Sequence, residues 1–187
     1  ADWKLVHTLA SVDPAGGAFV VTYDVDGRPW RYTDEIGRKT EVFYDGRGRM
    51  ARYVYPELDE ELLEYDDRNN PIKLTKVPKP SSCTPTCPPD QVIEAAYHTT
   101  WNKPLWVKDQ LGRQSDFTYF ETGNGKSLIA TALRPAIAGT RPQYSYTYDS
   151  RGLPLSTPDP TGRVAQNTYD ATNGTMLSMV VDPGAGH

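Results

Sequence analysis

A Tyr-Asp pair that returns at a fixed spacing constrains the fold of this chain more than any other feature. The pair occurs at Tyr23-Asp24, Tyr44-Asp45, Tyr65-Asp66, Tyr148-Asp149 and Tyr169-Asp170. Successive pairs lie 21 residues apart from 23 to 65 and again from 148 to 169, and two degenerate copies begin at Tyr97 and Tyr119. A fixed period of this length indicates a repeat architecture, in which each repeat is one small structural unit that packs on its neighbours.

A second landmark, Asp-x-x-Gly, lies near the middle of the units. It is found at 13–16, 34–37, 109–112 and 159–162, and the positions that define it best are Asp34, Gly37, Asp109, Gly112, Asp159 and Gly162. The segment after each Tyr has the same chemistry, with Asp24, Gly27 and Arg28, with Asp45 and Gly48, and with Asp149 and Gly152. The Asp side chain can accept backbone N–H bonds, and Gly or Asn (as in Asn69-Asn70) tolerates positive φ. Each unit is therefore predicted to contain two turns.

Between these turns the apolar residues alternate. Phe19, Val21 and Tyr23 fall on one face of an expected strand, and Tyr144, Tyr146 and Tyr148 repeat the pattern. Alternation bounded by Asp/Gly turns predicts a β-hairpin in every unit. Tyrosines at equal register are expected to stack into an aromatic ladder.

The predicted fold class is all-β, with antiparallel β-hairpin repeats that form a spiralling sheet. We expect residues 1–187 to be a single array of about seven 21-residue units, with insertions near 77–92 and 127–143. The second insertion is expected to be a loop at about 130–142.

Charge and hydropathy exclude several classes of partner. The net charge is −4 with a pI near 5.4, and the arginines are mostly single residues after Gly, so a nucleic-acid partner is not expected. No apolar run reaches the roughly 20 residues of a membrane-spanning helix. The chain shows no signal-peptide pattern and no starting Met, so we expect a fragment or processed piece of a longer protein.

The order Tyr-Asp-x-x-Gly-Arg followed by Thr-Asp-x-x-Gly-Arg, seen from Tyr23 to Arg38, resembles the YD repeat of Rhs proteins. The same repeat is shared by toxin-complex B and C components, bacterial wall-associated proteins and animal teneurins. The resemblance implies a β-sheet that spirals into a hollow shell, which in bacterial relatives encloses a toxic C-terminal domain. Relatives also carry a self-cleaving aspartyl protease segment, and this sequence contains no counterpart of it.

No residue pattern predicts catalysis, and we expect no enzyme activity, cofactor or metal. The segment Gly123 to Ser127 ends like a phosphate-binding loop, but Phe120 occupies the place of the first Gly, so a turn is the better interpretation. His7, His98 and His187 are scattered, and His98 is interpreted as a turn residue in the Asp place of a degenerate repeat.

Three further features leave alternatives open. Cys83 and Cys87 are interpreted as a local disulfide, with free thiols and metal ligands as the alternatives. The acidic stretch from Glu57 to Asp67 is interpreted as a solvated strand that protects a sheet edge, although a divalent cation site is the alternative. Trp30, Trp101 and Trp106 could stack on sugars, but packing on the sheet is the simpler explanation.

The function predicted from these features is architectural. The leading hypothesis is a shell segment of a bacterial Rhs-type toxin or toxin-delivery protein, secreted or at the cell surface, that encapsulates a C-terminal effector. The alternative is a cell-surface adhesion or carbohydrate-binding module. The expected partners are the remainder of the same long chain, with further repeats and a toxin domain. A second copy bound at an exposed sheet edge and a glycan are further candidates.

Overall fold

The computed structural model describes residues 7–12, 16–80, 86–123 and 125–182. This part of the chain folds into β-strands, and every pairing between neighbouring strands is antiparallel. The chain divides into two compact units, Ala1–Ile93 and Glu94–His187. The prediction of an all-β fold built from antiparallel hairpins is confirmed.

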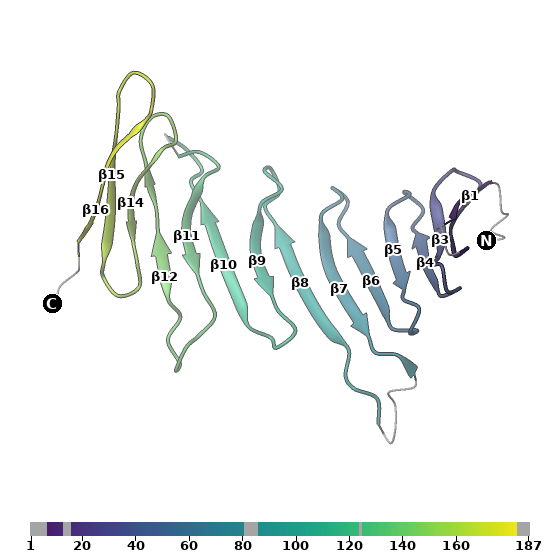
Figure 1. Ribbon diagram of the computed structural model, residues 1–187. Coiled ribbons are helices and arrows are strands. Elements are labelled where there is room, and N and C mark those ends of the chain that lie inside the picture. The colour runs from purple at the N-terminus through teal and green to yellow at the C-terminus, as the bar shows by residue number, and fades with distance from the viewer. Residues whose placement is uncertain (1–6, 13–15, 81–85, 124, 183–187) are drawn as a thin grey trace. The chain divides into compact units, whose positions relative to one another are not determined.

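The first unit contains strands that follow one another in sequence order, each hydrogen-bonded to the next (Figure 1). They are β1 (His7–Val12), β2 (Ala18–Tyr23), β3 (Pro29–Thr33), β4 (Lys39–Tyr44), β5 (Met50–Val54), β6 (Glu60–Tyr65) and β7 (Pro71–Val77).

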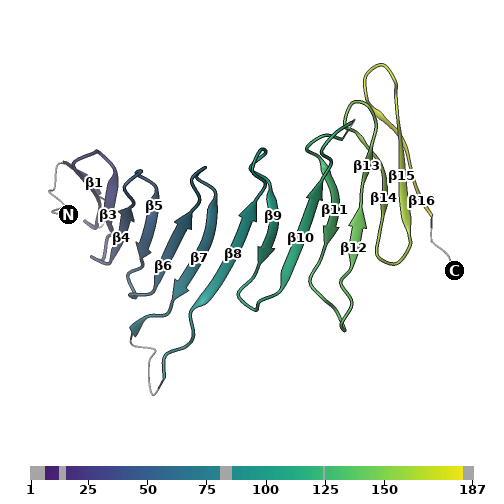
Figure 2. The ribbon, with the colours of Figure 1, turned by 180° about the vertical axis from the view of Figure 1, so that it is seen from behind.

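The second unit repeats this meander, as the reverse view in Figure 2 also shows. One run contains β8 (Gln91–Tyr97), within which the division between the units falls, β9 (Pro104–Lys108), β10 (Gln114–Tyr119), β11 (Ile129–Leu133) and β12 (Gln143–Ser145). A four-stranded sheet follows, with β13 (Thr147–Tyr148), β14 (Pro154–Pro158), β15 (Val164–Tyr169) and β16 (Met176–Asp182).

Every repeat tyrosine lies at a β-bulge. The register shifts immediately before Tyr23, Tyr44, Tyr65, Tyr97, Tyr119, Tyr148 and Tyr169. The residue opposite the tyrosine begins the next strand, and at Pro29, Pro71, Pro104 and Pro154 it is a proline. Because proline has no N–H to give to the ladder, it suits a bulge at the first residue of a strand. The repeat therefore encodes a hairpin end as well as a turn.

Little apolar surface is buried. Among the described residues, only Val42 (4% exposed) and Ala132 (2% exposed) are buried hydrophobic side chains. On β16, by contrast, Leu177, Met179 and Val180 are each at least 60% exposed. The strands are thus stabilised mainly by their ladders and by contacts between neighbouring hairpins, as expected for a repeat protein.

The prediction for the acidic stretch is wrong in one respect. β6 pairs with β5 on one side and with β7 on the other, so it is not a sheet edge. Its carboxylates face basic residues across the strands: Glu60 bonds Arg52, Glu61 lies 3.0 Å from Lys76, and Glu64 lies 3.0 Å from Lys73. Opposite charges placed directly across strands stabilise the pairing.

The second insertion also differs from the prediction. Residues 129–133 form β11 rather than part of a loop. The extra length is divided between two turns, which run from Phe120 to Leu128 and from Arg134 to Pro142. Each has nine residues where the repeat has five, as in Asp34 to Arg38, so the strands keep their frame.

Candidate functional site

The turn after each repeat tyrosine recurs along the chain, and Asp24 shows how it is built. Asp24 Oδ1 accepts hydrogen bonds from the backbone N–H groups of Asp26 and Arg28, both at 2.9 Å. Its Oδ2 accepts a hydrogen bond from Arg28 Nε, also at 2.9 Å. Gly27 adopts φ +76°, which a β-carbon would strain. We call this arrangement the Asp clamp.

The Asp clamp recurs both in turns that follow a repeat tyrosine and in turns near the middle of a unit. Asp34 with Arg38, Asp45 with Arg49, and Asp109 with Arg113 make the same three bonds. In the turn after Tyr65, Asn70 takes the place of Arg and donates from Nδ2 to Asp66 Oδ2 at 2.8 Å, while Asn69 adopts φ +67°. The arginines that follow Gly in the sequence are thus turn residues, each bonded to the Asp of its own turn.

The clamp also sets the protonation of its carboxylates. Burial alone would raise the pKa of the Asp24 carboxyl, but its bonds with Arg28 and Asp26 outweigh burial and hold that pKa below its ordinary value of 3.8. In Asp45, the bond from the backbone of Arg49 is the largest cause of a lowered pKa. These aspartates are ionised acceptors rather than proton donors, which suits a structural role.

Within each unit, hairpins are joined to their neighbours by repeat tyrosines. Tyr44 donates its hydroxyl hydrogen bond to the carbonyl oxygen of Pro29, the residue opposite the preceding bulge, at 2.8 Å. Four more tyrosines make the same bond to the preceding hairpin: Tyr65 to Met50, Tyr119 to Pro104, Tyr148 to Ile129 and Tyr169 to Pro154. The repeat thus satisfies a strand-end carbonyl of one hairpin with a side chain of the next.

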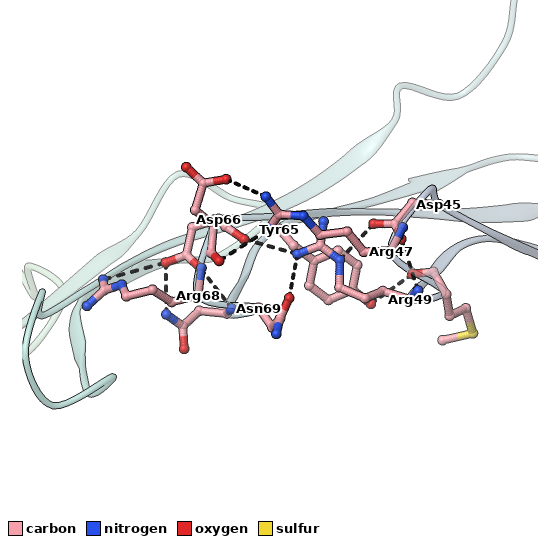
Figure 3. A network of polar contacts seen from close by, with 10 residues as sticks. Asp45, Arg47, Arg49, Tyr65, Asp66, Arg68 and Asn69 are labelled. Atoms are coloured by element: carbon pink, nitrogen blue, oxygen red, sulfur yellow. Dashed lines mark hydrogen bonds and ion pairs between the residues drawn. The ribbon is translucent and has the colours of Figure 1, made fainter.

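Arginines of the turns make a second link between hairpins. Arg49 Nη1 donates to the carbonyl oxygen of Asp66 at 3.0 Å and to Asn69 Oδ1 at 2.9 Å (Figure 3). Its guanidinium also lies 4.6 Å from the centre of the Tyr65 ring. In the second unit, Arg151 Nη1 reaches the carbonyl of Asp170 at 2.8 Å. The turns that begin at Asp45 and Asp149 are therefore each bonded to the turn of the following repeat.

This geometry corrects the expected aromatic ladder. Among the described residues, the ring contacts do not include a pair of consecutive repeat tyrosines. A basic side chain lies over the tyrosine ring instead: Arg28 over Tyr44 at 4.9 Å and Lys103 over Tyr119 at 5.7 Å. In these repeats the tyrosine ring therefore contacts a basic side chain and not the ring of the next repeat tyrosine.

His98 lies in a turn, at the Asp position. Its Nδ1 accepts the backbone N–H of Thr100 at 3.1 Å, which is the bond that Asp Oδ1 makes elsewhere. Its Nε2 lies 3.3 Å from the Glu121 carboxylate. The imidazole stacks on Trp101 with ring centres 4.1 Å apart. These contacts support the interpretation of His98 as a turn residue.

The segment that ends like a phosphate-binding loop uses its own backbone donors. The N–H of Ser127 bonds the carbonyl of Phe120, and the N–H of Leu128 bonds that of Gly125. Lys126 N–H bonds the carbonyl of Gly123. Because a phosphate cradle needs free backbone N–H groups, these bonds favour the turn interpretation.

The remaining sequence candidates are placed as follows. Cys87 is disulfide-bonded, but Cys83 lies outside the described residues, so the pairing of the two stays a prediction. One face of the Trp30 ring is covered by the guanidinium of Arg31 at 4.1 Å, and Trp106 lies on β9. A glycan site on the tryptophans also stays a prediction. His7 pairs with Tyr23 in the β1–β2 ladder, and His187 lies outside the described residues.

Within the described ranges, no group of three or more His, Cys, Asp or Glu side chains is placed to hold a metal ion. The same ranges contain no helix long and apolar enough to cross a membrane.

Comparison with known proteins identifies the fold. No protein-family model and no curated protein sequence matches the chain. Among solved structures, TcdB2-TccC3 without its hypervariable C-terminal region matches 94% of this chain at 12% identity, with a TM-score of 0.64. The TcdB2-TccC3-TEV structure matches the same share at 12% identity, with a TM-score of 0.65. The Photorhabdus luminescens Tc holotoxin pore matches 92% at 11% identity, with a TM-score of 0.56.

These likenesses show the fold. The resemblance to YD-repeat proteins that the sequence predicted is therefore confirmed for the architecture of the chain. The chain spans about a tenth of the length of the toxin-complex chains that it matches, since it covers 10% of each.

Proposed function

We propose that this chain is a structural segment of a β-hairpin repeat shell in a bacterial toxin or toxin-delivery protein, and that the shell encloses a polypeptide effector outside the producing cell. The observation that carries the proposal is the bond that five of the repeat tyrosines make to the preceding hairpin, as from Tyr44 to Pro29. Because the same bond can join any hairpin to the one before it, it is suited to a sheet that is extended by adding repeats.

Two further observations support a structural role. The aspartates of the repeat are paired in clamps, as in Asp24 with Arg28 and Asp45 with Arg49. They act there as hydrogen-bond acceptors, which favours a structural role over acid-base chemistry. The likeness to TcdB2-TccC3 adds support for a toxin setting. We therefore propose no catalytic activity for this segment.

Proteolysis of the full natural chain that carries this segment tests the proposal. If the repeats enclose a polypeptide, one stretch of the chain outside the repeats will resist protease until mild urea opens the wall. The control is the same stretch expressed without the repeats, which should be cut at once. Equal cleavage rates in the two preparations would contradict encapsulation.

A further inference from the structure

A pocket of about 620 Å³ in the first unit lies where the chain departs from its repeat. Its lining comes from the β5–β6 turn, from the adjoining parts of β6 and β7, and from Pro88 and Gln91 at the far end of the first insertion. Ligand pockets in proteins commonly have volumes of about 300–1,000 Å³. Inserted loops on a repeat frame are also where binding residues concentrate.

The β5–β6 turn reverses the charge pattern of the repeat. One unit earlier the turn reads Asp34-Glu35-Ile36-Gly37-Arg38, whereas here it reads Tyr55-Pro56-Glu57-Leu58-Asp59. The backbone bonds are kept, from Tyr55 N–H to the carbonyl of Asp59 and from Leu58 N–H to that of Tyr55. Leu58 nevertheless adopts φ +69°, a conformation that favours glycine. The fold therefore retains the turn while its clamp residues have been replaced.

This replacement leaves a carboxylate without a clamp partner. Asp34 is held by Arg38 at 2.6 Å, but Asp59 stands at the position of that arginine. Within the described residues, the Asp59 carboxylate makes no hydrogen bond or ion pair, and it acts on Lys76 only through longer-range charge. Nearby, Glu57 and Lys79 are 3.8 Å apart, a loose pair whose side chains are 68% and 43% exposed.

The pocket as a whole is negative and partly aromatic. Four carboxylates and two lysines line it, and because Arg52 behind the lining pairs with Glu60, the local net charge is −1. Glu61 bonds Tyr55, and burial together with the Glu61 charge raises the pKa of the Tyr55 hydroxyl. Tyr55, Pro78 and Pro88 supply apolar wall. An aromatic ring beside the unpaired carboxylate of Asp59 and the loosely paired carboxylate of Glu57 is the chemistry that receives an ammonium or guanidinium group, since both attract a cation.

We propose that this pocket, which we call the acidic pocket, binds a lysine or arginine side chain of a basic peptide segment. The Asp59 carboxylate accepts hydrogen bonds from the cation, Glu57 contributes as Lys79 is displaced, and the aliphatic stem lies along Tyr55 and Pro88. A bound divalent metal is the less suitable occupant, because no described group of three or more ligands is placed for one. This site goes beyond the structural role, since a wall does not require it.

Binding of dye-labelled hexalysine to the 187-residue chain, followed by fluorescence anisotropy, tests the proposal. Asp59→Asn should weaken binding about two- to five-fold, and adding Glu57→Gln should weaken it further, since exposed ion pairs contribute that much. Glu35→Gln is the matched control. It removes the same charge from an exposed residue of the corresponding turn one unit earlier, and that residue does not line the pocket.

The outcomes distinguish a specific site from general electrostatic attraction. Weaker binding of hexalysine to Asp59→Asn, with unchanged binding to Glu35→Gln, supports the acidic pocket. The same difference between the two variants at about 0.15 M salt, where distant charges are screened, also supports it. Equal effects of the two substitutions, or hexaglutamate binding as tight as hexalysine, would overturn it. So would the absence of hexalysine binding at millimolar peptide.

Discussion

The Asp clamp predicts a steep cost for changing Asp24, whose carboxylate is fully buried. Asp24→Asn keeps an oxygen that accepts the N–H groups of Asp26 and Arg28. It replaces the second oxygen with an amide that cannot accept from Arg28 Nε. Asp24→Ala removes all three bonds and leaves the two backbone N–H groups without partners.

The expected magnitudes follow from the bonds lost. A hydrogen bond to a charged group contributes about 1.5–3 kcal/mol, so Asp24→Asn should lower the free energy of unfolding by about 2 kcal/mol. Asp24→Ala adds two unsatisfied donors at about 1 kcal/mol each, for a total of about 4 kcal/mol. The same substitutions at Asp34 should cost clearly less, since its side chain is 21% exposed and water can replace the lost partner.

Urea unfolding followed by circular dichroism measures these differences, with Asp34 as the matched control because it makes the same three bonds. The reasoning requires the order Asp24→Ala, then Asp24→Asn, then wild type in rising stability. If Asp24→Ala destabilises no more than Asp34→Ala, burial of the clamp does not determine its contribution, and the argument fails.

Four further predictions concern the whole chain. The folded pKa values of the clamp aspartates lie below their ordinary value of 3.8, so their stabilisation is complete well above that pH and is lost progressively as pH falls through the unfolded and then the folded values. The urea midpoint should therefore begin to drop below about pH 5, and a drop that begins near neutral pH contradicts this. Leu58→Gly should raise stability by about 0.5–1 kcal/mol by relieving positive φ, as a shifted urea midpoint would show. Thiol counting of oxidised, denatured chain should find no free thiol; two would exclude a Cys83–Cys87 bridge. Light scattering should show association through the exposed β16 edge, and a strict monomer at high concentration would count against it.

The hairpins and their turns could be predicted from the sequence because their chemistry is local. An Asp, a Gly and an Arg within five residues contain every atom of the clamp, so the pattern at Asp24 to Arg28 determines the turn without reference to the rest of the chain. The same reasoning placed Asn69 correctly at positive φ. Spacing alone then fixed two strands per unit.

The contacts between hairpins could not be predicted in the same way. Equal register suggested that tyrosine rings would stack, but the bulge before each tyrosine shifts it toward the carbonyl of the preceding hairpin, as Tyr65 reaches Met50. The arginine of the preceding clamp then occupies the space over the ring. Period-two alternation predicts neither the bulge nor the contact of the arginine with the tyrosine ring. Both depend on how one hairpin is displaced relative to the next in space.

The bulge and its tyrosine also explain why the repeat tolerates change at its turns. The turn from Phe120 to Leu128 is four residues longer than the consensus, yet Tyr119 keeps its bulge and Tyr148 still bonds the carbonyl of Ile129 at 2.9 Å. Where this bond is made, the frame therefore depends on one tyrosine and one carbonyl, and the turn between them is free to vary in length and charge. In the β5–β6 turn the same freedom replaced a clamp arginine with Asp59 without loss of the turn. Binding sites in such a chain should therefore be sought where a turn departs from Asp-x-x-Gly-Arg, since those residues are the ones that the wall does not require.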